Sequence, residues 1–397
     1  MFKIQTLNHI AVAGLDRLPR ETYEIASEMV HPDALLVRSA SLHGRPIPES
    51  VKAIGRAGAG VNNIPVAEMS MRGIAVFNAP GANANAVKEL VVAGMLLAAR
   101  NIAPAWQFAR DLDGDDAAIH QAVEAGKKRF VGFELPGRTL GVIGLGAIGV
   151  LVANAARALG MRVIGYDPSI TVRSAWRLER DVEAALSIDD LVARSDFITS
   201  HVPLTEQTRH LISGERIRTM KDGAVLLNFS RNGIIDDDAA ITALDTGKLY
   251  AYICDFPSNL LKGHPRVVTL PHLGASTAEA EVNCAVMVAE QLRAYLEDGN
   301  VTHSVNFPEI VLPRNGGYRI AVVNRNVPNM VGQMSSDLAA AGLNILDMLN
   351  RSRGDMAVTL IDVERPCPPA TAREIAAIEG VLSVRCLGGK TVASDTD

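Results

Sequence analysis

The feature that most constrains the fold of this 397-residue chain is the segment L-G-V-I-G-L-G-A-I-G at residues 140–149. Gly144, Gly146 and Gly149 stand there in G-x-G-x-x-G spacing, between an apolar run and a stretch with helical character. In a strand–turn–helix unit the first glycine permits a tight turn, and the second lets a pyrophosphate approach the backbone. The third lets the helix pack closely on the strand. The segment therefore predicts a dinucleotide site, with Ala147 and Ile148 at the helix N-terminus.

An acidic residue follows this unit at the expected place. Asp167, in V-I-G-Y-D-P, ends the next predicted strand. A carboxylate at that position accepts hydrogen bonds from both ribose hydroxyls and repels a 2′-phosphate. The glycine spacing alone would also suit an ordinary structural turn, but together with Asp167 it predicts NAD as the cofactor rather than NADP.

Strands alternate with helices over most of the chain, which predicts α/β domains with parallel sheets covered by helices. Near the N-terminus, predicted strands end in A-L-L-V-R-S-A (34–40) and A-V-F-N-A-P (75–80). A long buried helix is expected from Asn85, with Asn85 as its N-cap and Glu89 near its positive end. A second series of strands has the pattern of a doubly wound sheet, at 139–144, 162–166, 197–201, 224–229, 251–255 and 267–270.

The C-terminal region has a different pattern. Residues 297–308, E-D-G-N-V-T-H-S-V-N-F-P, have the composition of a linker. The last ~80 residues predict a β-α-β-β-α-β module of the ferredoxin-like type. Its strands are expected at 319–323, 345–350, 356–363 and 382–387, and its helices at 330–341 and 371–378.

Composition narrows the function classes. A net charge of −5 argues against non-specific binding to nucleic acid or to an anionic membrane. No apolar run approaches the roughly 18 residues of a membrane span, and the apolar run in M-F-K-I-Q-T-L-N-H-I is too short for a signal peptide, so we expect none. The four cysteines, Cys254, Cys284, Cys367 and Cys386, show no C-x-x-C pairing and no metal-ligand spacing. We therefore expect buried thiols, no metal and a reducing, cytoplasmic location.

Two residues at predicted strand ends are candidates for chemistry. Arg231 follows the strand A-V-L-L-N-F, where α/β sheets place their ligands, and its guanidinium matches a carboxylate and polarises a carbonyl. A surface salt bridge to Asp236 or Asp237 is the alternative. His272, in T-L-P-H-L-G-A-S-T, is either an acid/base or a histidine that merely ends a strand.

The order of the motifs decides between these alternatives. G-L-G-A-I-G, H-V-P-L-T, N-F-S-R-N-G-I-I-D and P-H-L-G-A-S-T follow one another along the chain. In this order and at these separations they resemble the D-isomer-specific 2-hydroxyacid dehydrogenases. R-A-G-A-G-V-N-N-I and N-A-P-G-A-N-A-N-A-V-K-E-L resemble, more narrowly, the members that oxidise 3-phospho-D-glycerate. The tail resembles an ACT domain, and the resemblance covers essentially the whole chain.

The resemblance implies a discontinuous domain plan. A flavodoxin-like substrate domain takes residues 1–84 and 274–308, and a Rossmann NAD domain at 85–273 is inserted into it. Residues 317–397 form the ACT regulatory domain. In such enzymes the active site lies in the cleft between the first two domains.

The resemblance also assigns roles to residues. His272 would be the acid/base, Arg231 would hold the substrate carboxylate and the C2 oxygen, and Asp255 would border the cofactor and the arginine. The implied cofactor contacts are Gly144, Gly146, Ala147, Ile148, Gly149, Asp167, His201, Val202, Pro203, Phe229, Ser230, Arg231, Asp255, His272, Gly274 and Ala275. The implied substrate contacts are Arg38, Gly58, Ala59, Gly60, Asn78 and Arg231. The alternative for Arg38 is a solvated arginine, and the alternative for the loop 58–60 is an ordinary tight turn. For Arg56 a substrate contact and a purely structural role are equally expected.

One position departs from the family pattern. The family pairs its catalytic histidine with a glutamate five residues after the aspartate of a D-V-F-x-x-E segment. Here the segment is D-F-P-S-N-L, so Leu260 stands at that position. Either Asp255, or another carboxylate such as Glu279 or Glu281, takes over the role. Otherwise His272 is more often neutral, which favours oxidation of an alcohol.

The ACT-like tail carries candidate effector contacts. In serine-sensitive relatives the ligand lies at the loop after the first strand and the start of the second. The matching residues are Asn324 and Asn326 in N-R-N-V-P and Asn344 in G-L-N-I, whose amides can hold an amino acid. Ordinary loop and turn roles are the alternative for all three. Asn329 replaces the usual glycine after the proline and is expected to cap the next helix.

The resemblance implies NAD-dependent oxidation of 3-phospho-D-glycerate to 3-phosphohydroxypyruvate, the first step of the phosphorylated route to L-serine. It also implies a homodimer or homotetramer and an L-serine effector. One alternative is a dehydrogenase of another 2-hydroxy acid, such as glycerate or 2-hydroxyglutarate. Another is a non-catalytic, NAD-sensing protein of the corepressor kind, against which Arg231 and His272 weigh.

Overall fold

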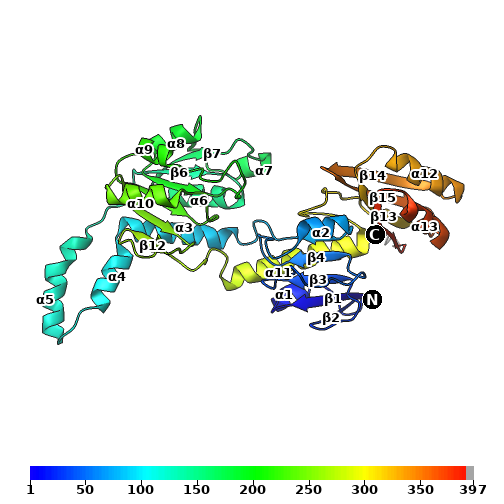
Figure 1. Cartoon of the computed structure of the whole chain (residues 1–397), viewed down its shortest axis with the longest axis horizontal. Helices are drawn as coiled ribbons and strands as arrows, with labels where there is room; N and C mark the ends of the chain where they lie inside the picture. The colour runs from blue at the N-terminus through cyan, green and yellow to red at the C-terminus, as the bar shows by residue number, and fades with distance from the viewer. Residues whose placement is uncertain (390–397) are drawn as a thin grey trace, which may run out of the picture. The chain divides into compact units, whose positions relative to one another are not determined.

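The computed structural model describes residues 1–389, which divide into two compact units (Figure 1). One unit consists of Met1–Asn83 and the chain from Glu281 onward, and the other is Ala84–Ala280. The divisions lie at 83/84 and 280/281, where the sequence analysis expects 84/85 and 273/274. The second division falls inside the long helix α11 (Ala278–Asp298). The expected α/β class with two parallel sheets and a small C-terminal antiparallel sheet is confirmed.

The N-terminal part of the first unit is a five-stranded parallel sheet in the order β2-β1-β3-β4-β5. This is the flavodoxin-like order, and its two short helices are α1 (Val12–Leu15) and α2 (Val66–Met71). The strands are β1 (Phe2–Leu7), β2 (Tyr23–Ala26), β3 (Ala34–Val37), β4 (Ala53–Arg56) and β5 (Ala75–Phe77). β3 and β5 are buried at every position, which explains their unbroken apolar runs.

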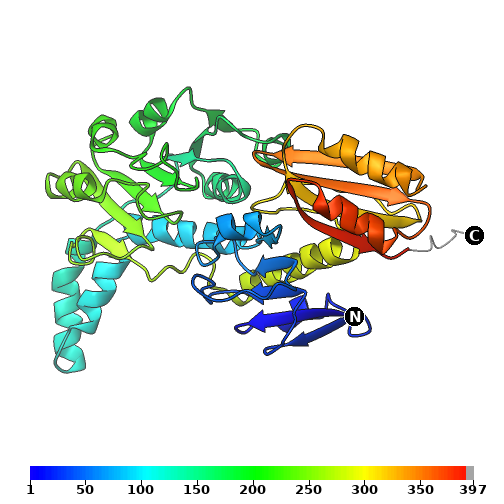
Figure 2. The ribbon, with the colours of Figure 1, turned by 45° about the vertical axis from the view of Figure 1, so that its right-hand side comes forward.

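The C-terminal module of this unit has the strand order β14-β15-β13-β16, with all pairs antiparallel. The strands are β13 (Tyr318–Arg325), β14 (Ile345–Arg353), β15 (Met356–Val363) and β16 (Val381–Leu387). Two helices, α12 (Met330–Ala340) and α13 (Pro369–Ala377), cover one face of the sheet (Figure 2). This is the ferredoxin-like topology.

The opposite face of the module's sheet shares a core with the rest of its unit. Val323 and Leu360 belong to the same buried cluster as Leu292 and Tyr295 of α11 and Phe77 of β5. A buried ion pair secures the linker at this junction. The Arg319 guanidinium is fully buried and donates to both carboxylate oxygens of Asp362, at 2.6 and 2.7 Å. Its Nη1 donates to the carbonyl of Asp298, in the linker, at 2.9 Å and to that of Leu312, just after the linker, at 2.7 Å, so charge-assisted hydrogen bonds hold the linker.

The second unit contains a seven-stranded parallel sheet in the order β12-β11-β10-β9-β6-β7-β8. The order reverses between β6 and β9, as in dinucleotide-binding folds. The strands are β6 (Thr139–Ile143), β7 (Arg162–Tyr166), β8 (Val182–Ala184), β9 (Phe197–Ser200), β10 (Ala224–Asn228), β11 (Leu249–Cys254) and β12 (Val267–Thr269). Its helices are α3 (Ala84–Ala99), α4 (Ile102–Arg110), α5 (Asp116–Gly126), α6 (Ala147–Ala158), α7 (Val172–Ala175), α8 (Ile188–Arg194), α9 (Gly214–Thr219) and α10 (Asp237–Asp245), with the 3-10 turn η1 at Lys127–Phe130.

Helices α4 and α5 extend away from the body of this unit (Figure 1). No residue of α4 is buried, and the side chains of Ile102 and Trp106 are 44% and 58% exposed. This helical pair was not predicted from the sequence.

Three local predictions are wrong. Helix α3 begins at Ala84, so Asn85 lies in its first turn and donates to Glu89 at 2.8 Å instead of capping the helix. Asn329 stands at the N-cap position of α12 but makes no side-chain capping bond, and its φ of +65° is one that glycine adopts more readily. Of the four thiols only Cys254 and Cys284 are buried, whereas Cys367 is half-buried and Cys386 is exposed.

Within residues 1–389, none of the helices combines the length and the apolar character that a membrane span requires.

Candidate active site

The glycine turn between β6 and α6 has three glycines in three different environments. Gly144 has a φ of +89°, which a residue with a side chain rarely adopts. A Cβ on Gly149 would lie 1.9 Å from the Gly144 carbonyl oxygen, so helix and strand meet without space for a methyl group. A Cβ on Gly146 would meet no atom within 4 Å. The turn is therefore tight everywhere except at Gly146, where the open space fits a pyrophosphate at the helix N-terminus.

Asp167 follows β7 and closes the same turn from the neighbouring strand. Its Oδ2 accepts a hydrogen bond from the Leu145 amide at 2.8 Å, and its Oδ1 accepts one from the Ser169 amide at 2.9 Å. A carboxylate offers about four lone-pair sites, so each oxygen keeps capacity for another donor. Asp167 thus fits the expected ribose contact.

His201 follows β9 on the other side of the turn. Its amide donates to the Ile143 carbonyl at 2.7 Å, and its ring Nε2 lies 3.1 Å from the Thr199 hydroxyl. Burial lowers the pKa of His201 to about 4, so the ring is neutral at pH 7. Its Nδ1 is buried without a protein partner, which leaves one polar atom for a ligand. Val202 and Pro203 continue the chain as a partly exposed turn.

The three predicted catalytic residues follow three adjacent strands. Arg231 comes after β10, Asp255 directly follows β11, and His272 comes after β12. The carboxyl ends of parallel strands meet at one edge of a sheet, which is where the glycine turn also lies. Arg231 is exposed, and its Nη1 donates a hydrogen bond to the Ser230 carbonyl at 2.7 Å. It makes no ion pair with Asp236 or Asp237: Asp236 caps α10 and Asp237 accepts from Tyr252.

Asp255 is the most constrained member of this group. The residue is 1% exposed, its Oδ2 accepts from the Gly274 amide at 3.2 Å, and its Oδ1 has no partner. Burial raises the pKa of the Asp255 carboxyl, while the Gly274 bond and the positive charges of His272 and Arg231 lower it. A buried carboxylate with an unsatisfied oxygen is costly, which is typical of a functional group.

His272 is exposed and has a left-handed backbone, with a φ of +51°. Its amide donates to the Asp255 carbonyl at 3.1 Å, which fixes the loop against β11. Its ring meets the ring of Phe256 edge-on, with centroids 5.2 Å apart. Gly274 and Ala275 continue the loop, and Gly274 supplies the amide that binds Asp255.

Asn228 is a positioning residue that the sequence analysis misses. It is 1% exposed, and its Nδ2 donates to the Arg231 carbonyl at 3.0 Å. Its Oδ1 accepts from the Ser230 hydroxyl at 3.0 Å, so one amide shapes the turn that carries Arg231. The sequence signal that could have identified Asn228 is an asparagine at the end of the fully buried run A-V-L-L-N. Phe229 packs its ring against Gly94 of α3, which leaves only its backbone for a cofactor.

The predicted substrate residues follow three neighbouring strands of the other unit. Arg38 comes after β3, the loop Gly58–Gly60 after β4, and Asn78 after β5. Asn78 donates to the Ala59 carbonyl, at 2.5 Å, and so shapes the loop. The side chain of Arg56 lies against Gly58, where a Cβ would meet its Nη1 at 2.3 Å.

Arg38 is neither free nor simply solvated. Its Nη2 donates to Glu281 at 2.5 Å, and both side chains are 36% exposed. Glu281 is therefore engaged by Arg38, which removes it as a ready substitute for the glutamate missing at Leu260. Glu279 and Leu260 are both exposed.

The candidate effector residues differ in accessibility. Asn324 is 1% exposed; its Nδ2 donates to the Arg325 carbonyl at 2.7 Å and its Oδ1 has no partner. Asn326 is exposed and donates to the Gly354 carbonyl at 3.1 Å. Asn344 lies in the exposed turn before β14.

Comparison with known proteins agrees with this geometry. Residues 92–274 match the model of the NAD binding domain of D-isomer specific 2-hydroxyacid dehydrogenases. The chain is 38% identical over 82% of its length to D-3-phosphoglycerate dehydrogenase of Methanocaldococcus jannaschii, covering 61% of that protein. It is 38% identical over 68% of its length to hydroxypyruvate reductase of Thermotoga maritima, covering 87% of that protein.

A solved structure extends the likeness to three dimensions. NAD⁺-bound 3-phosphoglycerate dehydrogenase of Entamoeba histolytica superposes with a TM-score of 0.59 and 26% identity, over 77% of this chain and 98% of that one. The chain spans 50–61% of the length of the first three curated relatives. The expected NAD-binding domain is confirmed, and this chain belongs to the D-isomer specific 2-hydroxyacid dehydrogenase family.

Proposed function

We propose that the chain oxidises 3-phospho-D-glycerate to 3-phosphohydroxypyruvate with NAD, as the first step of the phosphorylated route to L-serine. The observation that carries the proposal is the placement of Arg231, Asp255 and His272 at the ends of β10, β11 and β12, on the sheet that also bears the glycine turn. Curated relatives with the name D-3-phosphoglycerate dehydrogenase support this choice of substrate.

NAD, when bound, would accept the hydride that leaves C2 of the substrate. The residues that would hold it are Gly146 with the amides of α6, Asp167 at the ribose, and the backbone of His201–Pro203. Arg231 would bind the substrate carboxylate and stabilise negative charge on the C2 oxygen. His272 would take the hydroxyl proton as hydride leaves, which requires its neutral form.

Asp255 is the carboxylate that we assign to His272 in place of the glutamate absent at Leu260. Three observations support the assignment: its carboxyl interacts electrostatically with His272 and Arg231, its Oδ1 is free, and it shares the His272 loop through Gly274. A negative charge there would stabilise the imidazolium that forms during oxidation. Glu281 is not assigned this role, because its carboxylate is already paired with Arg38.

Arg38, the loop Gly58–Gly60 and Asn78 would bind the anionic ends of the substrate. Arg38 would then exchange Glu281 for a substrate oxyanion, since a guanidinium holds phosphate or carboxylate with two parallel bonds. Arg38→Met should raise KM for 3-phosphoglycerate more than tenfold with a smaller effect on the Kd of NAD. Glu281→Gln, which frees Arg38, should leave KM unchanged or lower it.

The decisive assay is the reduction of NAD with 3-phospho-D-glycerate, with glycerate and 2-hydroxyglutarate as competitors. A specific observation favours glycerate as second candidate, because hydroxypyruvate reductase of T. maritima is 38% identical. A kcat/KM higher for glycerate than for the phosphorylated acid would reverse our choice. NAD binding without turnover of any of these acids would instead support an NAD-sensing protein.

We also assign serine sensing to the C-terminal module, as an ACT domain. The support is the ferredoxin-like topology, together with the unpaired Oδ1 of Asn324 close to the exposed Asn326 in sequence. L-serine, added to the turnover assay, should inhibit the chain, and Asn326→Ala should weaken inhibition while leaving uninhibited turnover intact. Equal inhibition by D-serine or L-alanine would contradict a specific amino-acid site.

The chain is further assigned as a homodimer, held by α4 and α5. This helical pair leaves Ile102 and Trp106 largely exposed, and large apolar side chains gathered on one exposed helix are typical of an interface. Trp106→Glu should shift sedimentation equilibrium toward monomer. A wild-type chain that stays monomeric at micromolar concentration would overturn the assignment.

A further inference from the structure

Two cysteines that are far apart in sequence lie at the same end of the C-terminal module. Cys367 stands in the loop between β15 and α13, just before the helix begins, and Cys386 is near the end of β16. β15 and β16 both run antiparallel to β13, so they run in the same direction and end at the same edge of the sheet. The topology therefore brings the start of α13 next to the end of β16.

The two cysteines also belong to the same face of the sheet. Cys386 pairs across the ladder with Ile320, which belongs to the core between the sheet and its two helices. Val384, two residues earlier on the same face of β16, packs against that core, and so does Cys367. The two thiols interact directly with each other, and the Cys367 S–H also donates to the Pro368 carbonyl at 3.6 Å.

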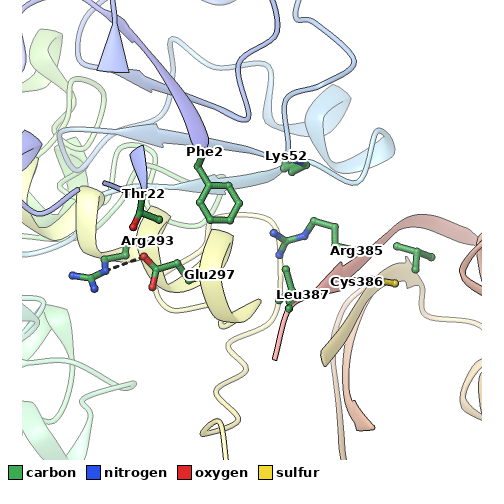
Figure 3. A pocket seen from close by; sticks show the side chains of 10 residues that line it. Phe2, Thr22, Lys52, Arg293, Glu297, Arg385, Cys386 and Leu387 are labelled. Atoms are coloured by element: carbon green, nitrogen blue, oxygen red, sulfur yellow. Dashed lines mark hydrogen bonds and ion pairs between the residues drawn. The ribbon is translucent and has the colours of Figure 1, made fainter. Parts of the chain in front are cut away.

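Small solutes can reach this pair. Cys386 is exposed and Cys367 is half-buried, whereas Cys254 and Cys284 are 0% and 3% exposed. On the opposite face of β16, Arg385 and Leu387 point toward Phe2 in a separate pocket of about 580 Å³, away from the Cys386 sulfur (Figure 3). The two most accessible thiols of the chain are thus the ones that lie together.

We infer that Cys367 and Cys386 form a reversible, redox-controlled disulfide when the chain meets a hydroperoxide. In the first step one thiolate sulfur attacks the peroxide, the O–O bond breaks, and a sulfenic acid forms with loss of one water after protonation. The second thiol then loses its proton and attacks the sulfenic sulfur, which releases a second water. Two thiols and one hydrogen peroxide therefore give one disulfide and two waters, and a dithiol reductant reverses the reaction.

The surroundings of the two thiols differ, which indicates the sulfur that reacts first. Burial and the neighbouring Cys386 raise the pKa of Cys367 to about 12. Burial also raises the pKa of Cys386, but the interaction with Cys367 lowers it. Because Cys386 is exposed and Cys367 is half-buried, peroxide reaches Cys386 first, and Cys367 then resolves the sulfenic acid.

The bridge would tie the beginning of α13 to β16 and restrict the unfolded module. Closing a loop of this size typically stabilises the folded state, and the closed loop contains all of α13 and most of β16. We therefore expect the oxidised chain to unfold at a higher temperature than the reduced chain. The oxidised chain should also resist proteolysis between the two cysteines.

The test uses the full chain, reduced and then exposed to graded hydrogen peroxide. Intact mass should fall by two hydrogen atoms, two of the four thiols should stop reacting with an alkylating agent, and peptide mapping should join Cys367 to Cys386. Thioredoxin or dithiothreitol should restore all four thiols. The double variant Cys254→Ser/Cys284→Ser should behave like the wild type.

Single variants separate the pair from simple surface oxidation. Cys367→Ser should leave a sulfenic acid on Cys386 that dimedone traps, and Cys386→Ser should leave Cys367 reduced under the same treatment. The inference is overturned if the wild type accumulates sulfinic acid on Cys386 without a bridge, if the bridge joins two chains, or if it involves Cys254 or Cys284.

Discussion

The glycine turn supports a paired test, because two glycines three residues apart differ in what a methyl group would meet. In Gly146→Ala the new Cβ meets no protein atom within 4 Å, and the negative φ of −76° lies outside the left-handed region that requires glycine. In Gly149→Ala the Cβ would lie 1.9 Å from the Gly144 carbonyl oxygen. The same substitution therefore probes cofactor approach at one position and packing at the other.

The magnitudes follow from these distances. An ordinary contact begins near 3.4 Å, so helix α6 must move by about 1.5 Å (3.4 minus 1.9) to admit the methyl group that Gly149→Ala introduces. Overpacking of this kind costs about 1–3 kcal/mol, or roughly 2–10 °C in Tm for a unit of this size. Gly146→Ala should change Tm by less than about 2 °C, yet weaken NAD binding at least tenfold, about 1.4 kcal/mol, because its methyl group occupies the pyrophosphate space.

Calorimetry of NAD binding and thermal unfolding of the free protein measure both effects on the same samples. The expected pattern is a binding defect without a stability defect for Gly146→Ala, and a lower Tm for Gly149→Ala. Wild-type affinity for NAD in Gly146→Ala would refute the placement of the pyrophosphate. An unchanged Tm in Gly149→Ala would refute the close packing of α6 on β6.

Three further predictions concern buried charges. Burial lowers the pKa of His201 to about 4, so on acidification the unfolded chain binds a proton at this residue before the folded chain does. In urea titrations the wild type should therefore lose about 2 kcal/mol more stability than His201→Asn between pH 7 and pH 5. Equal losses in the two proteins would contradict this. Burial raises the pKa of Asp255, so its ionised form destabilises the folded chain at neutral pH. Asp255→Asn should therefore raise Tm while it lowers kcat/KM at least tenfold. A variant that is both stable and fully active would remove Asp255 from the mechanism. Arg319→Met should lower the free energy of unfolding by about 3–5 kcal/mol, because it leaves the buried Asp362 carboxylate unpaired. The double variant Arg319→Met/Asp362→Leu should recover much of that loss. Equal Tm values for the single and double variants would show that the lost bonds to the linker carbonyls, and not the unpaired Asp362, cause the destabilisation.

Much of the fold was predictable because it depends on local patterns. The buried strands of parallel sheets are continuous apolar runs, and Gly144 and Arg231 each follow such a run, whereas His272 follows the half-buried β12. Since parallel strands end at one edge, residues placed after separate runs could be assigned to that edge before the strand order was known. The same reasoning overlooked Asn228, because an asparagine at a strand end is as often a turn residue as a buried hydrogen-bonding one.

Other errors came from effects that a local pattern does not contain. The positive φ of Asn329 and the start of α3 at Ala84 depend on how the chain enters each helix. The exposed pair α4 and α5 has ordinary helical periodicity, and only the structure shows that Trp106 stays largely uncovered within its unit.

The sequence by itself determined which residues are candidates for the chemistry: a glycine turn for a dinucleotide, an arginine and a histidine at strand ends, and Leu260 where a carboxylate partner of the histidine was expected. It could do so because each of these signals is contained in a few consecutive residues. The tertiary structure alone decided the partners. Arg38 pairs with Glu281, Asp255 is buried with a free oxygen, and Cys367 meets Cys386. Partnerships of this kind join strands and helices that are distant in sequence, and packing of the folded chain selects them.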